Sequence, residues 1–248
     1  MKTRDIIIDA DHVAFNVADS KEHDDGGVGG VSLDEKINMK PFKKHFKRLI
    51  EEYVSIAEVE SIAYGWKIGK VRVILSDVTN FRYEVYPEYK NKRPPNHEVR
   101  HKLRKWARKY YECEPNTEAD DVVAYYVRKG GIGFTTDKDL FKGVAGIWYN
   151  AHYMHRCWIR TTESEAEYFF KCQVLAGDGV DGIPSIVGVG IPTAEKLLSK
   201  YGESWDNILQ IFIDKGYTKE YMITMARLVS MTQWTPKKGI KLWKFPKE

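Results

Sequence analysis

Three short apolar runs, each ending on or beside aspartate and separated by helical segments, constrain the fold most in this chain of 248 residues. Asp5–Asp9, Val71–Asp77 and Ile132–Thr136 are rich in β-branched residues and are too short for buried helices. Continuous apolar strands are typical of parallel sheets, which are covered on both faces. The runs therefore predict an α/β fold with a mainly parallel central sheet flanked by helices, one of them over residues 38–62.

Aspartates gather where the predicted strands end. Asp9 ends the first strand, Asp77 ends the second, and Asp137 and Asp139 follow the third. The carboxyl ends of parallel strands meet at one edge of a sheet, where α/β proteins bind ligands. We therefore expect these carboxylates to lie close together, although each one alone is more often a turn residue or a helix cap.

A helix is predicted from Thr117, as its N-cap, to Val127, and its first turn carries Glu118, Asp120 and Asp121. Acids in a first turn complement the helix dipole, which is the ordinary explanation. Three acids with no basic residue among them also repel one another, and a bound cation would relieve that repulsion. Sites made only of carboxylates select hard divalent cations such as Mg²⁺ or Mn²⁺.

The last third of the chain adds two acids and a glycine-rich turn. Asp178 and Asp181 lie in a loop, and Gly188 and Gly190 are expected to form a tight hairpin before a helix that starts near Pro192. The free N–H groups of such a helix start can bind a phosphate. Gly-x-Gly before a helix is often no more than packing, so this signal alone is weak.

The net charge of +4 is unevenly distributed. Residues 81–111, the basic segment, contain ten Lys or Arg against three acids, a net charge of +7, so the rest of the chain carries −3. A basic segment beside an acidic pocket suggests a polyanion held over metal ions, whereas the commoner fate of a charge run is a solvated helix face. Tyr83, Tyr86 and Tyr89 can stack on bases or pack internally.

Composition indicates a soluble cytoplasmic protein. Its apolar runs are all too short for a membrane helix. The sequence Met1–Asp5 meets an acid at once, so a secretion signal is not expected. Cys113, Cys157 and Cys172 are widely spaced and form no paired motif, which predicts reduced core thiols.

Taken in order, these motifs resemble the flap endonuclease/5′–3′ exonuclease family, and most of all its phage members of the T7 type. The resemblance spans nearly the whole chain. The motifs that carry it are Asp9, Asp77 followed by Tyr89–Arg93, Glu118–Asp121, Thr136–Leu140, Gly177–Asp181, Gly188–Ala194 and Met225–Leu228. Thr136 replaces the family's usual glycine, and Pro94–Pro95 argues against one continuous helix in the basic segment.

The resemblance implies a metal-dependent 5′-nuclease acting at or near 5′ ends of duplex or flapped DNA, or on RNA in RNA–DNA hybrids, during DNA replication or degradation. It implies an α/β nuclease core, residues 1–165, in which the basic segment forms a helical arch. Residues 166–248 would be a helical DNA-binding region with a helix–hairpin–helix-like (helix-3-turn-helix) element over 183–201. Two Mg²⁺ or Mn²⁺ ions, a K⁺ ion at the hairpin, a monomeric state and replication proteins as partners complete the expectation.

Site residues carry over by position. The expected metal ligands are Asp9, Asp77, Glu118, Asp120 and Asp121 in a first cluster, Asp137 between the clusters, and Asp139, Asp178 and Asp181 in a second. Lys90 and Arg93 match the family's basic pair over the scissile phosphate. The expected DNA contacts are Tyr89, Lys92, Arg100, Arg104, Lys105, Gly188, Gly190, Thr193 and Lys196.

Two other classes of protein fit parts of the sequence. Asp9-Ala10-Asp11 also resembles the entry motif of haloacid-dehalogenase-type phosphatases, in which the first Asp is a nucleophile. That alternative leaves the basic segment and the glycine hairpin unexplained. A catalytically silent DNA-binding relative is the second alternative, and the full set of acids argues against it.

Overall fold

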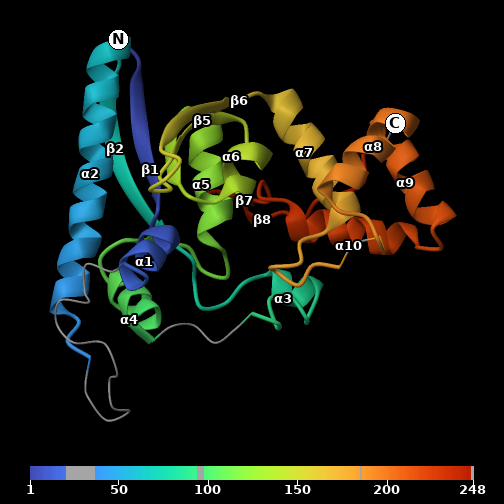
Figure 1. Ribbon diagram of the computed structural model, residues 1–248, viewed down its shortest axis with the longest axis horizontal. Helices are drawn as coiled ribbons and strands as arrows, with labels where there is room; N and C mark the ends of the chain where they lie inside the picture. The colour runs from blue at the N-terminus through green and yellow to red at the C-terminus, as the bar shows by residue number, and fades with distance from the viewer. Residues whose placement is uncertain (21–36, 94–97, 185, 247–248) are drawn as a thin grey trace.

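The computed structural model describes residues 1–20, 37–93, 98–184 and 186–246. Within these residues the central sheet has six strands in the order β3-β2-β1-β4-β5-β6 (Figure 1). The strands are β1 (Thr3–Asp9), β2 (Lys67–Leu75), β3 (Glu112–Cys113), β4 (Ile132–Thr135), β5 (Gly146–Asn150) and β6 (Cys157–Thr161). The first five are parallel and β6 pairs antiparallel with β5, which confirms the predicted, mainly parallel sheet.

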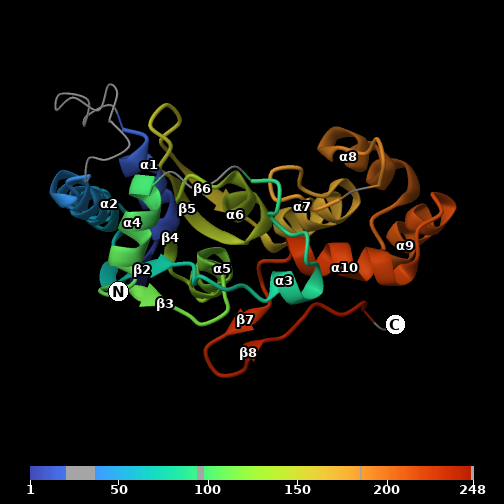
Figure 2. The ribbon, with the colours of Figure 1, turned by 90° about the horizontal axis from the view of Figure 1, so that it is seen from below.

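Helices cover both faces of the sheet. Successive side chains of the central strand β1 point to opposite faces, and the apolar ones pack against helices on each face. Ile6 and Ile8 of β1 pack with α1 (Ala10–Ala18), α2 (Lys40–Tyr64) and α4 (Glu98–Ala107). Ile7 packs on the opposite face with α5 (Ala119–Arg128) and α6 (Lys138–Gly143). Figure 2 shows the two helical layers on either side of the strands.

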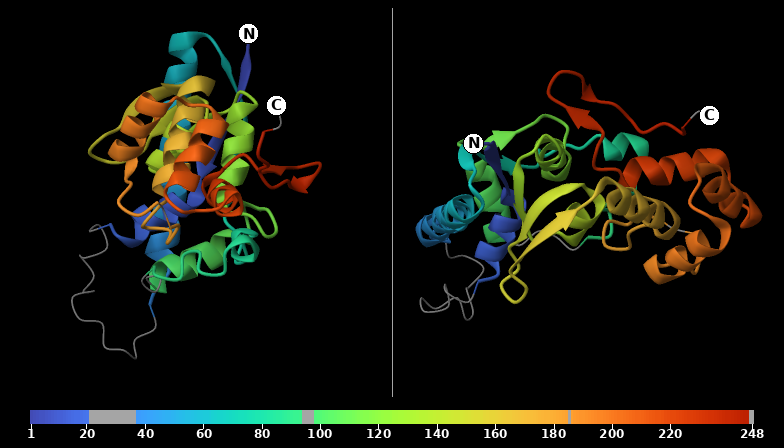
Figure 3. Two further views of the ribbon diagram at one scale, coloured as in Figure 1. Left: turned by 90° about the vertical axis from the view of Figure 1, so that its right-hand side faces the viewer. Right: turned by 90° about the horizontal axis from the view of Figure 1, so that it is seen from above.

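The C-terminal part of the chain forms a second, helical core. It is built by α7 (Glu163–Ala176), α8 (Ile191–Tyr201), α9 (Trp205–Asp214) and α10 (Lys219–Val229). The basic segment begins against this core, since Val85 of the short helix α3 (Arg82–Val85) and the buried Tyr89 pack in it. Beyond α10, the hairpin of β7 (Trp234–Thr235) and β8 (Gly239–Ile240) returns to the sheet domain, where Trp234 contacts Tyr125 of α5 (Figure 3).

Several local predictions need correction. Glu118, rather than Thr117, occupies the N-cap position of α5, and the Thr117 hydroxyl donates to the carbonyl of Pro115 at 2.9 Å. The predicted glycine hairpin is a turn without strands among the described residues 186–190, in which Gly188 has a φ of 79°. This left-handed conformation favours glycine, so the turn needs that residue.

The basic segment is not one helix in its described part. α3 ends at Val85 and α4 begins at Glu98, with turns through residue 93. The expected break at Pro94–Pro95 lies outside the described residues. Of the three free cysteines only Cys172 is a buried core thiol, because Cys113 is half-buried and Cys157 is exposed.

Membrane insertion through a helix finds no support in the described part of the chain, where no helix is both long and apolar enough to span a bilayer.

Close packing between β4 and β5 gives a stability test. A Cβ atom on Gly133 would lie 2.2 Å from the ring of the fully buried Trp148. Gly133→Ala should therefore lower the free energy of unfolding by about 1–3 kcal/mol, because overpacking forces rings or backbone to move. Thermal unfolding followed by circular dichroism measures this as a lower Tm. Gly179→Ala is the control, since nothing lies within 4 Å of its added Cβ, and equal Tm values for the two variants would contradict the packing.

Candidate functional site: a carboxylate cluster at the sheet edge

Asp9 lies at the carboxyl end of β1 and caps α1. Its Oδ1 accepts hydrogen bonds from the backbone N–H of Asp11 at 3.0 Å and of His12 at 3.4 Å, and Thr135 donates to Oδ2 at 3.0 Å. Burial raises the pKa of Asp9, but the hydrogen bonds and the charge of His12 together with Thr135 outweigh it and hold the pKa below its usual range. Asp9 is thus a fixed, ionised carboxylate.

Asp137 and Asp139 follow β4, beside Asp9. Asp137 caps α6 and accepts the backbone N–H of Asp139 at 2.8 Å. Burial raises the pKa of Asp137, and the nearby charge of Asp9 adds to it. The pKa of Asp139 rises to about 7, first through burial and then through repulsion from Asp137 and Asp178. These carboxylates are therefore costly to ionise together.

The start of α5 brings Glu118 and Asp120 to the same place. Burial raises the pKa of Asp120 well above its usual range, and the charges of Asp137 and Asp9 raise it further. Glu118 behaves in the opposite way, because the cations of Lys90 and Arg82 overcome its burial and lower its pKa to about 2. The structure thus brings Asp9, Asp137, Asp139, Glu118 and Asp120 together, which are some of the strand-end and helix-start acids that the sequence predicted would meet.

The loop after α7 supplies the last two acids. Asp178 pairs with Ile183 through two backbone hydrogen bonds, and its Oδ1 accepts the N–H of Val180 at 2.8 Å. Asp181 accepts a hydrogen bond from the hydroxyl of Tyr89 at 3.0 Å. The same hydroxyl contacts Glu118 at 2.9 Å, so Tyr89 bridges the α5 start and this loop.

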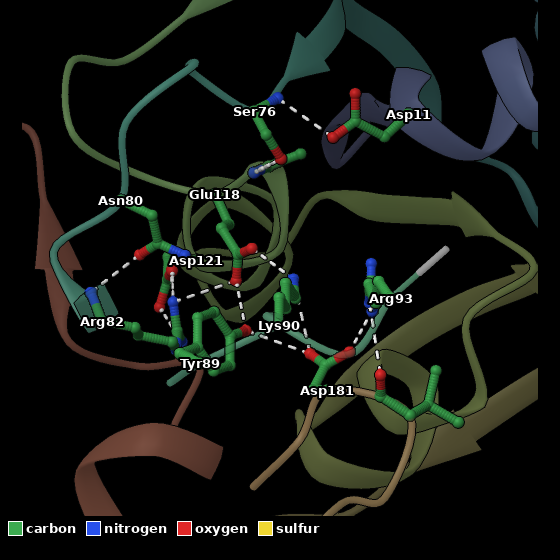
Figure 4. A network of polar contacts seen from close by, with 12 residues as sticks. Asp11, Ser76, Asn80, Arg82, Tyr89, Lys90, Arg93, Glu118, Asp121 and Asp181 are labelled. Carbon is green, nitrogen blue, oxygen red and sulfur yellow. Dashed lines mark hydrogen bonds and ion pairs between the residues drawn. The ribbon is translucent and has the colours of Figure 1, made fainter. Parts of the chain in front are cut away.

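Lys90 and Arg93 place positive charge inside the cluster (Figure 4). The Lys90 ammonium contacts Glu118 and lies 3.4 Å from Asp181, and the Arg93 guanidinium pairs with Asp181. Lys90 has a φ of 58° and donates its backbone N–H to the carbonyl of Asp181 at 2.7 Å. A non-glycine residue in this region is strained and is commonly found at functional sites.

Divalent cations suit these residues by donor chemistry. The cluster offers only carboxylate oxygens, which are the donors that Mg²⁺ and Mn²⁺ prefer. Burial, and after it the neighbouring carboxylates, raise the pKa values of Asp120 and Asp139, and a bound cation would favour their ionised forms. Among the described residues no three His, Cys or acidic side chains are arranged to hold an ion as they stand. Glu118 and Asp181 are turned toward Lys90, so metal binding requires these side chains to exchange partners.

Two predicted ligands have other partners. Asp121 is fully buried, and both of its oxygens accept hydrogen bonds from Arg82, at 2.6 and 3.0 Å. Asp77 accepts hydrogen bonds from Val78, Thr79 and Asn116. Asp121 thus forms an internal ion pair and Asp77 stabilises a loop, and their role as metal ligands stays a prediction.

The predicted DNA contacts also divide. Tyr89 is 2% exposed, too buried to stack on a base, and Arg104 pairs with Asp11 at 2.7 Å. Arg100 lies over the ring of Phe15 and 3.6 Å from Asp19. The remaining predicted contacts are exposed: Lys92, Lys105, Gly188, Gly190, Thr193 and Lys196.

Sequence reasoning missed three supporting residues. Thr135 holds Asp9, and its place just before Asp137 at a strand end was a usable signal. For Tyr89 the sequence predicts a ring that stacks on bases or packs internally, but not a hydroxyl that bridges Glu118 and Asp181. Arg82 was counted only as one of ten basic residues, and no spacing marked it as buried.

Comparison with known proteins gives partial sequence matches and a fold match over most of the chain. A flap endonuclease Xni of Aeromonas hydrophila is 27% identical over 155 residues, 54% of this chain and 57% of the relative. A 5′-3′ exonuclease of Aquifex aeolicus is 35% identical over 108 residues, 39% of this chain and 37% of the relative. A structure of bacteriophage T5 flap endonuclease with DNA and metal ions has a TM-score of 0.58 at 16% identity, covering 93% of this chain and 90% of that one.

These matches confirm the predicted fold and the resemblance to the flap endonuclease/5′–3′ exonuclease family. The chain spans little more than half the length of the Xni relative and less of the exonuclease. No family model matches the sequence.

The raised pKa of Asp139 makes stability depend on pH. Its pKa rises from an unfolded value near 4 to about 7 in the folded protein. The contribution of Asp139 to the free energy of unfolding is therefore fully present below about pH 4 and is lost as the pH rises through about 7. In EDTA, Asp139→Asn should match the wild type at pH 4 and be more stable at pH 8. After allowance for solvent screening we expect roughly 1 kcal/mol, or about 2–4 °C in Tm. A variant less stable than wild type at pH 8 would contradict the assignment.

Proposed function

We propose that this chain, which resembles the flap endonuclease/5′–3′ exonuclease family, is a divalent-metal-dependent 5′-nuclease that hydrolyses phosphodiester bonds at or near 5′ ends of duplex or flapped DNA. One observation carries the proposal. Carboxylates from β1, β4, the start of α5 and the loop after α7 meet at one sheet edge, and two basic side chains of the segment before α4 reach among them. A cluster of carboxylates with two cationic side chains beside it suits a phosphodiester that is bound to metal ions.

The cluster would hold two Mg²⁺ or Mn²⁺ ions. The proposed ligands are Asp9, Glu118, Asp120, Asp137, Asp139, Asp178 and Asp181. Such ions, when bound, lower the pKa of an attacking water and stabilise the leaving oxygen of an in-line displacement. Asp9 is ready to bind because Thr135 and the start of α1 hold its carboxylate, whereas the pKa values of Asp120 and Asp139 are raised and a bound cation would lower them.

Lys90 and Arg93 would bind the reacting phosphate. Their cations now neutralise Glu118 and Asp181, and a phosphate oxygen offers them the same kind of charge-assisted hydrogen bond. Fixed positive charge favours the additional negative charge of the transition state. This is electrostatic stabilisation, and it needs no Ser, Cys or His nucleophile.

The duplex would be bound at the start of α8. Gly190 is its N-cap, Pro192 has no N–H, and the N–H of Thr193 donates to the carbonyl of Gly190 at 2.9 Å, so a phosphate would meet the exposed side chains of Thr193 and Lys196. We include a K⁺ ion at the Gly188–Gly190 turn, RNA–DNA hybrids as a second substrate, a monomeric state and a role in DNA replication within this proposal. The exposed Lys92 and Lys105 would add further positive charge for the DNA backbone.

The phosphatase alternative is disfavoured by Asp11. Its carboxylate pairs with Arg104 and accepts the backbone N–H of Ser76 at 3.3 Å, so it stabilises the position of α4. The second acid of the Asp9-Ala10-Asp11 motif is therefore engaged in a structural ion pair.

Cleavage of 5′-labelled DNA tests the proposal. The wild type should release short 5′ products from a duplex or its flapped counterpart with Mg²⁺ and none with EDTA. Asp120→Ala should lower the rate at least ~100-fold, because even residues that only support a metal ligand commonly contribute ~10–100-fold. Asp206→Ala, an exposed acid on α9, is the matched control and should cleave normally. DNA binding without cleavage in Mg²⁺ or Mn²⁺ would leave the silent relative as the answer.

A further inference from the structure

We propose that Arg82 is a positioning residue for the carboxylate cluster, and that it holds Glu118 and the start of α5 in place from the C-terminal helices. This inference rests on the proposed metal-dependent function. Arg82 lies on α3, outside the predicted ligands and outside the basic pair of Lys90 and Arg93. Its side chain is 2% exposed, so it is not available to DNA.

Every N–H group of the Arg82 guanidinium has an acceptor. Nε donates to the carbonyl of Leu228 at 2.9 Å. One terminal nitrogen donates to Asp121 at 2.6 Å and to Glu118 at 3.3 Å. The other donates to Asp121 at 3.0 Å and to the carbonyl of Ser230 at 2.7 Å. A guanidinium has five N–H donors, so none is left over and the side chain has one orientation.

The acceptors come from two parts of the fold that the sequence separates by about a hundred residues. Asp121 and Glu118 belong to the start of α5, which carries Asp120 of the cluster. Leu228 and Ser230 belong to the end of α10, whose last carbonyls lack helical partners. Gln233 donates a second hydrogen bond to Ser230 at 3.2 Å. Arg82 therefore fixes the distance between the C-terminal helices and the carboxylate cluster.

Glu118 shows how this affects the cluster. Its Oε2 is held by Arg82 and by the Tyr89 hydroxyl, while its Oε1 faces Lys90 (Figure 4). Hydrogen bonds from Arg82 and Tyr89 thus fix Oε2 of Glu118, and Oε1 is left facing Lys90. Both oxygens of Asp121 are engaged by Arg82, so Asp121 cannot compete for the ion that Glu118 would bind.

A purely structural role would not need a guanidinium. Buried ion pairs add little net stability, and apolar side chains of similar size often replace them without loss. Apolar side chains cannot replace the planar guanidinium, which donates hydrogen bonds to two acids and two backbone carbonyls at once. Lysine keeps the charge but offers one nitrogen, so it can satisfy only part of this set.

Metal affinity of Arg82→Lys tests the inference. The variant keeps the net charge, so a Coulomb effect alone predicts unchanged affinity. Loss of positioning predicts Mn²⁺ binding weaker by about 10–100-fold, the usual effect of removing a residue that orients a ligand. Isothermal titration calorimetry at 10 °C measures it, with thermal unfolding to show that the variant is folded.

Arg72→Lys is the matched control. Arg72 is a partly buried arginine that pairs with Glu112 at 2.9 Å and lies on β2 away from the cluster. This variant loses the same kind of fork but should bind Mn²⁺ as the wild type does. Equal losses of affinity in both variants would overturn the inference, because the effect would then come from general destabilisation.

Arg82→Gln provides an independent variant with the opposite electrostatic expectation. It removes a positive charge beside the cluster, so Coulomb's law predicts tighter Mn²⁺ binding, whereas loss of positioning predicts weaker binding. Wild-type affinity in Arg82→Lys, tighter binding in Arg82→Gln, or failure of both variants to fold would overturn the inference. If the wild type itself binds no divalent ion, the proposed function fails along with the inference. If the wild type binds Mn²⁺ and both variants bind it equally well, the inference alone fails.

Discussion

Repulsion among carboxylates is the constraint on which this structure depends. Asp9, Asp120, Asp137 and Asp139 come from three separate elements, yet burial and mutual repulsion raise the pKa of the last three. A fold gathers such groups only if something compensates for their charge. Here Lys90, Arg93 and Arg82 supply cations, and all three come from the twelve residues that begin with α3.

The cations that balance the carboxylates also connect the two cores of the molecule. The sheet and the start of α5 carry most of the acids, while the C-terminal helices surround Tyr89 and accept the hydrogen bonds of Arg82. Residues 82–93 pack against the C-terminal core, while Arg82 and Lys90 reach Glu118 at the start of α5. Substrate bound by the C-terminal helices would thus act on the same residues that balance the carboxylate cluster.

Much of this arrangement was predictable from the sequence, because strand ends in a parallel sheet converge whatever the side chains pack against. Asp9, Asp137 and the start of α5 met for that reason. The partners of individual side chains were not predictable. Asp121 and Asp120 are adjacent and chemically identical, yet one turns to Arg82 and the other to the cluster. Asp77 lies just after a strand, as expected, but its side chain accepts a hydrogen bond from the N–H of Asn116, 39 residues away, and so stabilises a loop.

Anomalous X-ray diffraction from crystals grown with Mn²⁺ is the most direct test of whether the carboxylate cluster binds two divalent ions, since it locates the ions without depending on substrate or activity. We expect two peaks within coordination distance of the cluster, one beside Asp120 and Asp9 and one beside Asp139 and Asp178. We also expect that Lys90 has moved away from Glu118. Crystals with no peak at this edge of the sheet, and Lys90 still paired with Glu118, would contradict this expectation.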